Sequence, residues 1–184
     1  VRPDGDTIGC ASALCIALRQ LGRTAYLLYN RETTEHFLPY AQEFWAPEGF
    51  TPDHVVSVDI ASLSLLPENA EAYRDRIELA IDHHPSFEHF APQSCVIPER
   101  AACGEILYEI IEEMVSVNPE IALPLYVAIS TDTGGFIYSN VTADTHRAAA
   151  ALMDTGIDYR PVNKLFFQTK SRVRMQLEAA ILND

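Results

Sequence analysis

Four short polar segments of the chain carry side chains that could bind metal ions. They contain Asp4 and Asp6, then Asp59, then the Asp-His-His run 82–84, and finally Asp132, each after a short apolar run. Aspartate and histidine without paired cysteines suit manganese or magnesium better than a structural zinc ion. Two divalent ions sharing one carboxylate would be the natural arrangement. Together the segments predict metal-dependent hydrolysis of a phosphoester.

Each segment taken alone has a simpler interpretation. Asp-Gly-Asp at 4–6 is most often a turn, and adjacent histidines at 83–84 are often a surface pair. Asp59 could cap the helical region near Ser62, and Asp132 could begin a turn into the glycines that follow it. Four such coincidences in this order are much less expected than one, so the metal-site interpretation is favoured.

Short apolar strands alternate with helices along the chain, which predicts an α/β fold with a mostly parallel sheet flanked by helices. In such folds functional groups collect beyond the carboxyl ends of the strands, and three of the polar segments fall there. The segment around Asp132 follows a helix and would close the site from the side. The predicted strands are 24–29, 54–58, 77–81 and 94–97, and the predicted helices are 7–21, 34–42, 63–74 with a break at Pro67, 102–117, 119–131, 142–156, 159–167 and 173–182.

Composition and charge limit the classes of function. The 184 residues are 48% hydrophobic and 21% charged, which is typical of an ordinary globular protein. The formal net charge of −13 argues against a grip on long duplex nucleic acid, while small anionic substrates stay open because bound cations neutralise acids locally. No stretch approaches the roughly 18 apolar residues of a membrane helix, so we expect a cytoplasmic protein.

The four cysteines and the histidines outside the Asp-His-His run are not expected to take part in the chemistry. The cysteines lack CxxC spacing and should be reduced packing residues, and the other histidines have no matching partners. These side chains are Cys10, Cys15, Cys95 and Cys103, and His36, His54, His89 and His146.

The same four segments resemble the motifs of a known family. RPDGDTIGCA, VSVDIAS, AIDHHPSF and STDTGGFIYSNVTADTH look like motifs one to four of the DHH phosphoesterase superfamily. Within it the chain is most similar to the bacterial nanoRNases, which are oligoribonucleases that also dephosphorylate 3'-phosphoadenosine 5'-phosphate. The resemblance implies a RecJ-like N-terminal DHH catalytic domain and covers nearly the whole chain.

The resemblance implies a set of metal ligands. Asp6, His83 and Asp132 would hold one ion, and Asp59 would bridge to a second. Asp4 would bind the second ion together with a histidine that falls one position ahead of the first residue of this sequence. The implied cofactor is a pair of Mn²⁺ ions, with Mg²⁺ or Co²⁺ as alternatives.

Two further residues are implied to be catalytic. His84 would face the substrate phosphate, where it could stabilise developing charge or protonate the leaving oxygen. Asp82 would orient its neighbours by hydrogen bonding. The attack itself would come from metal-activated water.

The resemblance also implies how the chain is divided. Residues 1–156 would form the catalytic domain, with its first strand missing because a catalytic turn is rarely the start of a domain. Residues 157–184 would form a helical connector towards a DHH-associated substrate-binding domain that is absent from this sequence.

The expected activity is hydrolysis of short oligoribonucleotides from a terminus and of 3'-phosphoadenosine 5'-phosphate. The partner would be a short RNA or a small phosphorylated nucleotide, and a homodimer is compatible with the sequence. Alternatives that keep the metals are a cyclic-dinucleotide phosphodiesterase, a RecJ-type single-strand exonuclease and an inorganic pyrophosphatase. A non-enzymatic alternative is a sensor of metals or nucleotides.

Overall fold

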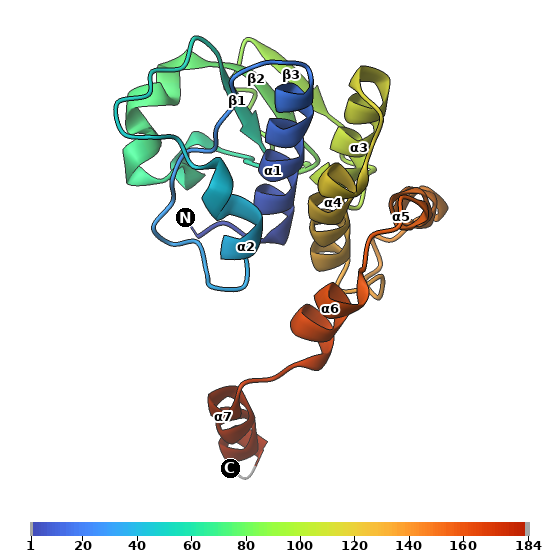
Figure 1. Ribbon diagram of the computed structural model, residues 1–184. Helices are drawn as coiled ribbons and strands as arrows, with labels where there is room; N and C mark the ends of the chain where they lie inside the picture. The colour runs from blue at the N-terminus through green and yellow to red at the C-terminus, as the bar shows by residue number, and fades with distance from the viewer. Residues whose placement is uncertain (1, 183–184) are drawn as a thin grey trace.

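A small parallel sheet lies at the centre of the computed structural model, which describes residues 2–182. Its strands are β1 (Val55–Val58), β2 (Ile77–Asp82) and β3 (Gln93–Val96), in the order β1-β2-β3, with both pairings parallel (Figure 1). The strands predicted at 54–58, 77–81 and 94–97 are therefore confirmed. Parallel strands place their carboxyl ends at one edge of the sheet, so β1 and β2 deliver the residues that follow them to one place.

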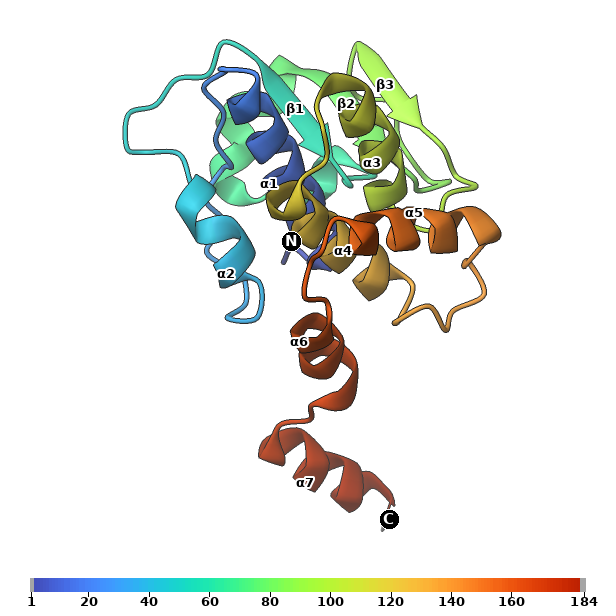
Figure 2. The same ribbon diagram turned by 45° about the vertical axis from the view of Figure 1, so that its right-hand side comes forward.

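Helices cover the sheet and bury the core, which confirms the predicted α/β class. Helix α1 (Gly5–Gln20) packs against β1, and α3 (Cys103–Met114) packs against β2. Helix α4 (Pro119–Asp132) lies against both of them, and α5 (Ala143–Asp154) packs on α4 (Figures 1 and 2). The largest buried side chains come mainly from α3 and α4, whose apolar residues repeat at helical spacing.

Two glycines allow α1 to approach α4 closely. A Cβ atom on Gly5 would lie 2.2 Å from the Thr131 hydroxyl, and one on Gly9 would lie 2.3 Å from the Pro124 carbonyl oxygen. Both distances are shorter than any real carbon contact, so a larger residue would push the two helices apart. The absence of these side chains brings the first turn of α1, with its acidic residues, next to the last turn of α4.

The strand predicted at 24–29 is wrong. In this segment only Leu27 forms a bridge, a single parallel one with Trp45, and the Ala46 N–H donates to the Leu27 carbonyl at 2.9 Å. The Tyr29 carbonyl, which would accept the next hydrogen bond of a parallel ladder, accepts instead from the Asn69 side chain at 2.7 Å. The apolar run is thus extended chain with a single β-bridge.

The helix predicted at 63–74 is also wrong in type. Two 3₁₀ helices occupy this region, η2 (Leu63–Leu65) and η3 (Glu68–Arg76), with the predicted break at Pro67 between them. Only Ala70 is buried in η3. Without an apolar stripe against the core, packing does not select a regular α-helix.

The helix predicted at 34–42 is shorter than expected. It begins only at Leu38, as α2 (Leu38–Ala41), and tightens into the 3₁₀ turn η1 (Gln42–Phe44). Pro39 lies in the first turn of α2, where its missing N–H costs no hydrogen bond, and this position explains why the helix starts there.

The helix predicted at 142–156 is confirmed together with both of its end signals. Thr142 is the N-cap of α5 and forms a capping box with Thr145. After the last turn, Gly156 adopts a left-handed conformation with φ of 92°.

The C-terminal segments leave the body of the fold (Figure 2). The predicted helix 159–167 is a short α6 (Arg160–Asn163) that widens into a π turn at Lys164–Gln168, and the predicted 173–182 is α7 (Arg172–Leu182). No residue of α7 is buried. Residues 183 and 184 of the predicted connector lie outside the described part of the chain. Among residues 2–182, no helix is both long and apolar enough to cross a membrane.

Candidate metal centre

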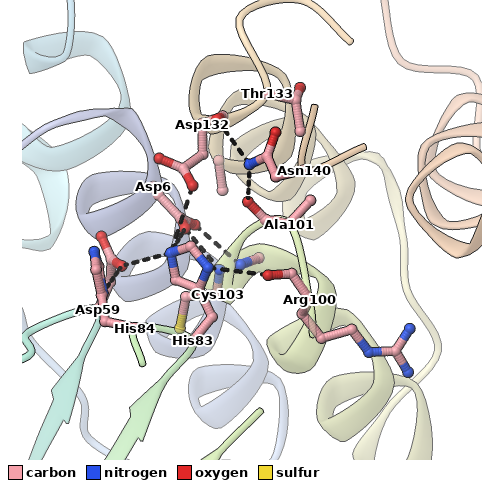
Figure 3. A network of polar contacts seen from close by, with 12 residues as sticks. Asp6, Asp59, His83, His84, Arg100, Ala101, Cys103, Asp132, Thr133 and Asn140 are labelled. Atoms are coloured by element: carbon pink, nitrogen blue, oxygen red, sulfur yellow. Dashed lines mark hydrogen bonds and ion pairs between the residues drawn. The ribbon is translucent and has the colours of Figure 1, made fainter. Parts of the chain in front are cut away.

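The four polar segments of the sequence meet at one end of the sheet (Figure 3). Asp4 is the N-cap of α1, and Asp6 lies in the first turn of that helix. Asp59 directly follows β1, and the run 82–84 begins at the last residue of β2. Asp132 is the last residue of α4. The parallel sheet and the α1–α4 contact therefore bring together residues up to 128 positions apart in the chain.

The imidazole of His83 lies at the centre of this cluster. Its Nε2 atom is 3.4 Å from Asp132 Oδ2, 3.7 Å from Asp59 Oδ1 and 3.8 Å from Asp6 Oδ2. Two sets of ligand atoms are close enough to share an ion: Asp6, His83 and Asp132 form one, and Asp59, His83 and His84 form the other. The first set is the group that the family resemblance implies for a single metal.

Two buried atoms at the centre of the cluster lack a hydrogen-bond partner. These atoms are His83 Nε2 and Asp59 Oδ1. A buried polar atom without a partner costs free energy, and native structures almost always satisfy such atoms. Both atoms offer lone pairs and face each other among carboxylates, so a divalent cation fits the position and would satisfy both of them.

A backbone contact determines which nitrogen of His83 carries the proton. His83 Nδ1 is 3.1 Å from the carbonyl oxygen of Arg100. A carbonyl oxygen can only accept, so Nδ1 must donate and, in the neutral ring, Nε2 keeps its lone pair. The ring is thus held in the tautomer that a metal ligand needs.

Asp6 is held in place by the start of α3. Its two carboxylate oxygens accept from the Cys103 N–H at 2.7 Å and the Gly104 N–H at 2.9 Å, and the Cys10 thiol donates to it at 3.1 Å. The amides at a helix N-terminus are otherwise unpaired and favour a negative charge. This buried carboxylate is therefore fixed by backbone amides and a thiol.

Asp59 combines a hydrogen bond with an unusual backbone conformation. Its Oδ2 atom accepts from the Thr7 hydroxyl at 2.8 Å, and its own N–H donates to the Ile81 carbonyl at 2.9 Å. The φ angle of Asp59 is 55°, in the left-handed region that only glycine enters freely. This turn directs the carboxylate from the end of β1 towards His83, and leaves Oδ1 free.

Asp82 organises the two histidines that follow it. Its Oδ1 atom accepts from the His83 N–H at 2.6 Å, from the His84 N–H at 3.0 Å and from His84 Nδ1 at 2.7 Å. The hydrogen bond to Asp82 raises the pKa of His84. Burial alone would raise the pKa of Asp82, but the hydrogen bonds from His84 and His83 lower it overall. The pair therefore favours an imidazolium at His84 beside an ionised Asp82.

The other carboxylates have raised pKa values. Burial and then the charge of Asp132 raise the pKa of Asp6 to about 7. Burial and the neighbouring Asp6 raise the pKa of Asp59, and burial followed by the charge of Asp4 raises that of Asp132. Clustered, desolvated carboxylates resist ionisation, and a bound cation would reverse that preference.

Asp4 is placed differently from the other predicted ligands. It is exposed, lies outside both sets of possible ligand atoms, and accepts from the Thr7 N–H at 3.0 Å and from the Thr7 hydroxyl at 3.1 Å. Its charge nevertheless raises the pKa of Asp59 and of Asp132, so it lies on the open side of the same cluster.

Several supporting groups were not recognised in the sequence. The thiol of Cys10 and the hydroxyl of Thr7 bond to carboxylates of the site, and Asn140 donates to the carbonyls of Ala101 at 2.9 Å and Asp132 at 3.4 Å. All four cysteines are free, as expected, but Cys10 bonds a site carboxylate besides packing in the core. The spacing of Asp4 and Thr7, typical of a helix cap, was a usable signal, whereas the backbone donors left none.

Comparison with known proteins identifies the class to which this fold and site belong. Residues 1–129 match the DHH family, N-terminal domain. The chain belongs to the DHH family, which confirms the predicted superfamily.

Individual relatives allow a more specific comparison within the DHH family. The chain is 31% identical over 183 residues to the bifunctional oligoribonuclease and PAP phosphatase of Thermus thermophilus, covering 95% of this chain and 54% of that protein. It is 24% identical over 179 residues to the protein of the same name from Bacillus subtilis, covering 94% of this chain and 56% of that protein. The chain thus spans about half the length of the curated relatives it matches.

A solved structure supports the fold independently. The crystal structure of an exopolyphosphatase-related protein from Bacteroides fragilis superposes with a TM-score of 0.87 at 22% identity, covering all of this chain and 58% of that one. At this level of identity the similarity concerns the fold alone.

Proposed function

We propose that this chain is the catalytic part of a metal-dependent phosphoesterase that hydrolyses short oligoribonucleotides and 3'-phosphoadenosine 5'-phosphate. The observation that carries the proposal is the convergence of three carboxylates on the unpartnered Nε2 atom of His83. The names of the relatives in Thermus and Bacillus support the choice of substrates. The reaction would take place in the cytoplasm, with a short RNA or small phosphorylated nucleotide as partner.

The proposed cofactor is a pair of Mn²⁺ ions, with Mg²⁺ or Co²⁺ as alternatives. Asp6, His83 and Asp132 would hold one ion, and Asp59 would bridge to a second ion that Asp4 binds from the open side. The oxygen-rich donor set with one imidazole suits these ions. Bound divalent ions supply Lewis-acid stabilisation of phosphate oxygens and lower the pKa of water.

We assign His84 to the substrate phosphate and Asp82 to its support. Nδ1 of His84 is engaged by Asp82, so Nε2 is the atom left to meet a substrate. An imidazolium there can hydrogen bond to a phosphate oxygen or protonate the leaving oxygen. Asp82 holds the ring in this orientation and favours its protonated form.

We further propose a division of the chain into a catalytic domain, residues 1–156, and a helical connector, residues 157–184. The connector would lead to a substrate-binding domain. Apolar side chains along α7 support this assignment, because they are well exposed: Val173, Leu177, Ile181 and Leu182. Homodimerisation remains part of the proposal, to be checked by light scattering.

Hydrolysis by the purified full-length protein tests the proposed function. The protein is stripped with a chelator and reloaded with Mn²⁺, Mg²⁺ or Co²⁺ in turn. A 5'-phosphorylated linear diadenylate and 3'-phosphoadenosine 5'-phosphate should release mononucleotide and phosphate only in the reloaded samples. Absence of release with every metal, despite stoichiometric metal binding, would contradict the enzymatic proposal and favour a metal sensor.

Competing substrates distinguish the alternatives. Cyclic di-AMP, pyrophosphate and a long single-stranded DNA are offered under the same conditions. Turnover of the linear diadenylate should exceed turnover of each. A preference for any of them would replace the oligoribonuclease assignment by the corresponding activity, without altering the metal site.

A further inference from the structure

Residues 100–104, which lead into and begin α3, contact two residues of the metal centre through their backbone. The Arg100 carbonyl accepts from His83 Nδ1, and the Cys103 and Gly104 amides donate to Asp6 (Figure 3). Backbone groups can orient a ligand only as well as the segment itself is held. The position of residues 100–104 therefore controls two ligands at once.

One buried side chain, that of Glu105, holds this segment in place. Glu105, in the first turn of α3, is almost completely buried. Its Oε1 atom accepts from the Ala101 N–H at 3.2 Å, and its Oε2 atom lies 3.7 Å from the Arg100 guanidinium. A buried carboxylate is costly unless it is paired, and both of these interactions are with the two residues that precede Ala102.

The Arg100 guanidinium and the Ala101 carbonyl have further anchors. Arg100 also forms ion pairs with Glu109 of α3 and, at 3.6 Å, with Asp144 of α5. Asn140 donates to the Ala101 carbonyl, so the segment is tied to the loop that follows α4. These anchors are more exposed than Glu105, which makes Glu105 the anchor best shielded from water.

We propose that Glu105 is a positioning residue for the metal centre. By holding Ala101 and the Arg100 side chain, it keeps the Arg100 carbonyl on His83 Nδ1, so that the His83 Nε2 lone pair is directed at the site carboxylates. The same contact keeps the α3 amides on Asp6. This inference rests on the proposed metal site and adds a residue that touches neither metal nor substrate.

Nitrogen NMR of His83 tests the proposal in the absence of metal. Full-length protein with ¹⁵N-labelled histidine is stripped of metal and measured at about pH 8, above the ordinary pKa of histidine. In the unmodified protein the proton should be on Nδ1. In Glu105→Ala a substantial fraction should move to Nε2, and Glu105→Gln, which keeps an acceptor for Ala101, should restore the Nδ1 form.

Titration with Mn²⁺, followed by electron paramagnetic resonance, gives a second readout. Glu105→Ala should weaken Mn²⁺ binding by about 10- to 100-fold, as is usual when the support of a metal ligand is removed. Glu105→Gln should recover most of that loss. Glu113→Ala is the matched control, because it removes an exposed acid from the same helix, and it should bind Mn²⁺ unchanged.

The outcomes separate this inference from the proposed function. If the unmodified protein binds no divalent metal, the proposed function fails, while the NMR result still tests the role of Glu105. If Glu105→Ala keeps both the Nδ1 tautomer and the original Mn²⁺ affinity, the inference is overturned. If Glu105→Ala does not fold, Arg100→Met is the second variant, because it removes the guanidinium beside Glu105 and opens no cavity beside α3. Arg100→Met should weaken Mn²⁺ binding about tenfold. Unchanged Mn²⁺ binding in this variant would overturn the inference.

Discussion

The inner and outer halves of the metal centre are built in different ways. The inner half contains Asp6, Asp59 and His83, whose side chains are 1%, 3% and 12% exposed. The outer half contains Asp132 and His84, which are 29% and 43% exposed, together with the exposed Asp4. Backbone amides, a backbone carbonyl and a hydroxyl hold the inner residues, whereas the outer ones border solvent.

This difference indicates that the two halves have different roles in the proposed function. Buried ligands with fixed hydrogen bonds lose little freedom when they bind an ion, so the inner half is preorganised. Under the proposed function the outer half would admit the substrate, so it could not be closed in the same way. Substitutions in the inner half should therefore remove metal binding, whereas substitution of His84 in the outer half, which is assigned to the substrate phosphate, should mainly affect turnover.

The largest effect is expected for Asp59→Asn in the inner half. An amide has no negative charge to share between two ions, so Mn²⁺ stoichiometry should fall and several kcal/mol of transition-state stabilisation should be lost, on the order of 10³-fold in turnover. Calorimetric metal titration and the diadenylate assay measure the two effects. Asp53→Asn, an exposed change just before β1, is the control, and near-native activity of Asp59→Asn would remove its bridging role.

The next largest effect is expected for His84→Ala, in the outer half. Loss of a proton donor and phosphate contact should lower kcat by about 10²- to 10⁴-fold, while Mn²⁺ affinity changes much less. The control is His54→Ala, because His54 is exposed beside the start of β1 and pairs with the surface residue Glu78. Unchanged kcat in His84→Ala would exclude His84 from the chemistry.

Gly9→Ala tests whether helix packing supports the inner half. The added methyl group would overlap the Pro124 carbonyl, so the free energy of unfolding should fall by about 1–3 kcal/mol, measured by urea denaturation. Mn²⁺ affinity should fall too, because Asp6 and Asp132 are on the two helices that separate. Gly22→Ala meets no neighbouring atom and carries only the cost of its left-handed φ, so it should leave Mn²⁺ affinity intact.

The smallest effect is expected for the pH dependence of thermal stability. The pKa of Asp6 is raised from 3.8 to about 7 in the folded protein, so the folded state binds more protons across that interval and loses stability as pH rises. The raised pKa of His84 acts in the same direction, and both losses should be offset by Mn²⁺. The gain in Tm on adding Mn²⁺ should thus be about 3 °C larger at about pH 8 than at about pH 5.5. An equal gain at both values would contradict this linkage.

The elements near the site were the most predictable from the sequence. Strong apolar runs ending at Asp59 and at Asp82 predicted β1 and β2, and Thr142 and Gly156 marked the ends of α5. The same patterns failed at 24–29, where the Tyr29 carbonyl bonds to the Asn69 side chain and not to a strand, and at 63–74, where no apolar stripe selects an α-helix. Local composition did not reveal these tertiary effects.

For the site itself, residue types predicted which side chains meet, but not how they are held. The carbonyl of Arg100 and the amides of Cys103 and Gly104 belong to the backbone, which every residue has, so no letter of the sequence marks them. The burial of Glu105 was equally invisible, because an acid in the first turn of an amphipathic helix normally faces solvent. The side-chain types were enough to predict the candidate ligands, whereas the hydrogen bonds around them could be found only from the folded structure.

The left-handed backbone of Asp59 has an evolutionary consequence. An ordinary side chain in this conformation costs roughly 1–2 kcal/mol that glycine would not pay. In chelator, Asp59→Gly should therefore unfold at a higher urea concentration than the unmodified protein, and a lower one would show that the turn is not strained. Under the proposed function, mutational drift towards a more stable fold at this position would lead directly to an inactive protein. Replacement of Asp59 by glycine, a change in one codon, could produce a descendant that has lost catalysis but kept the fold.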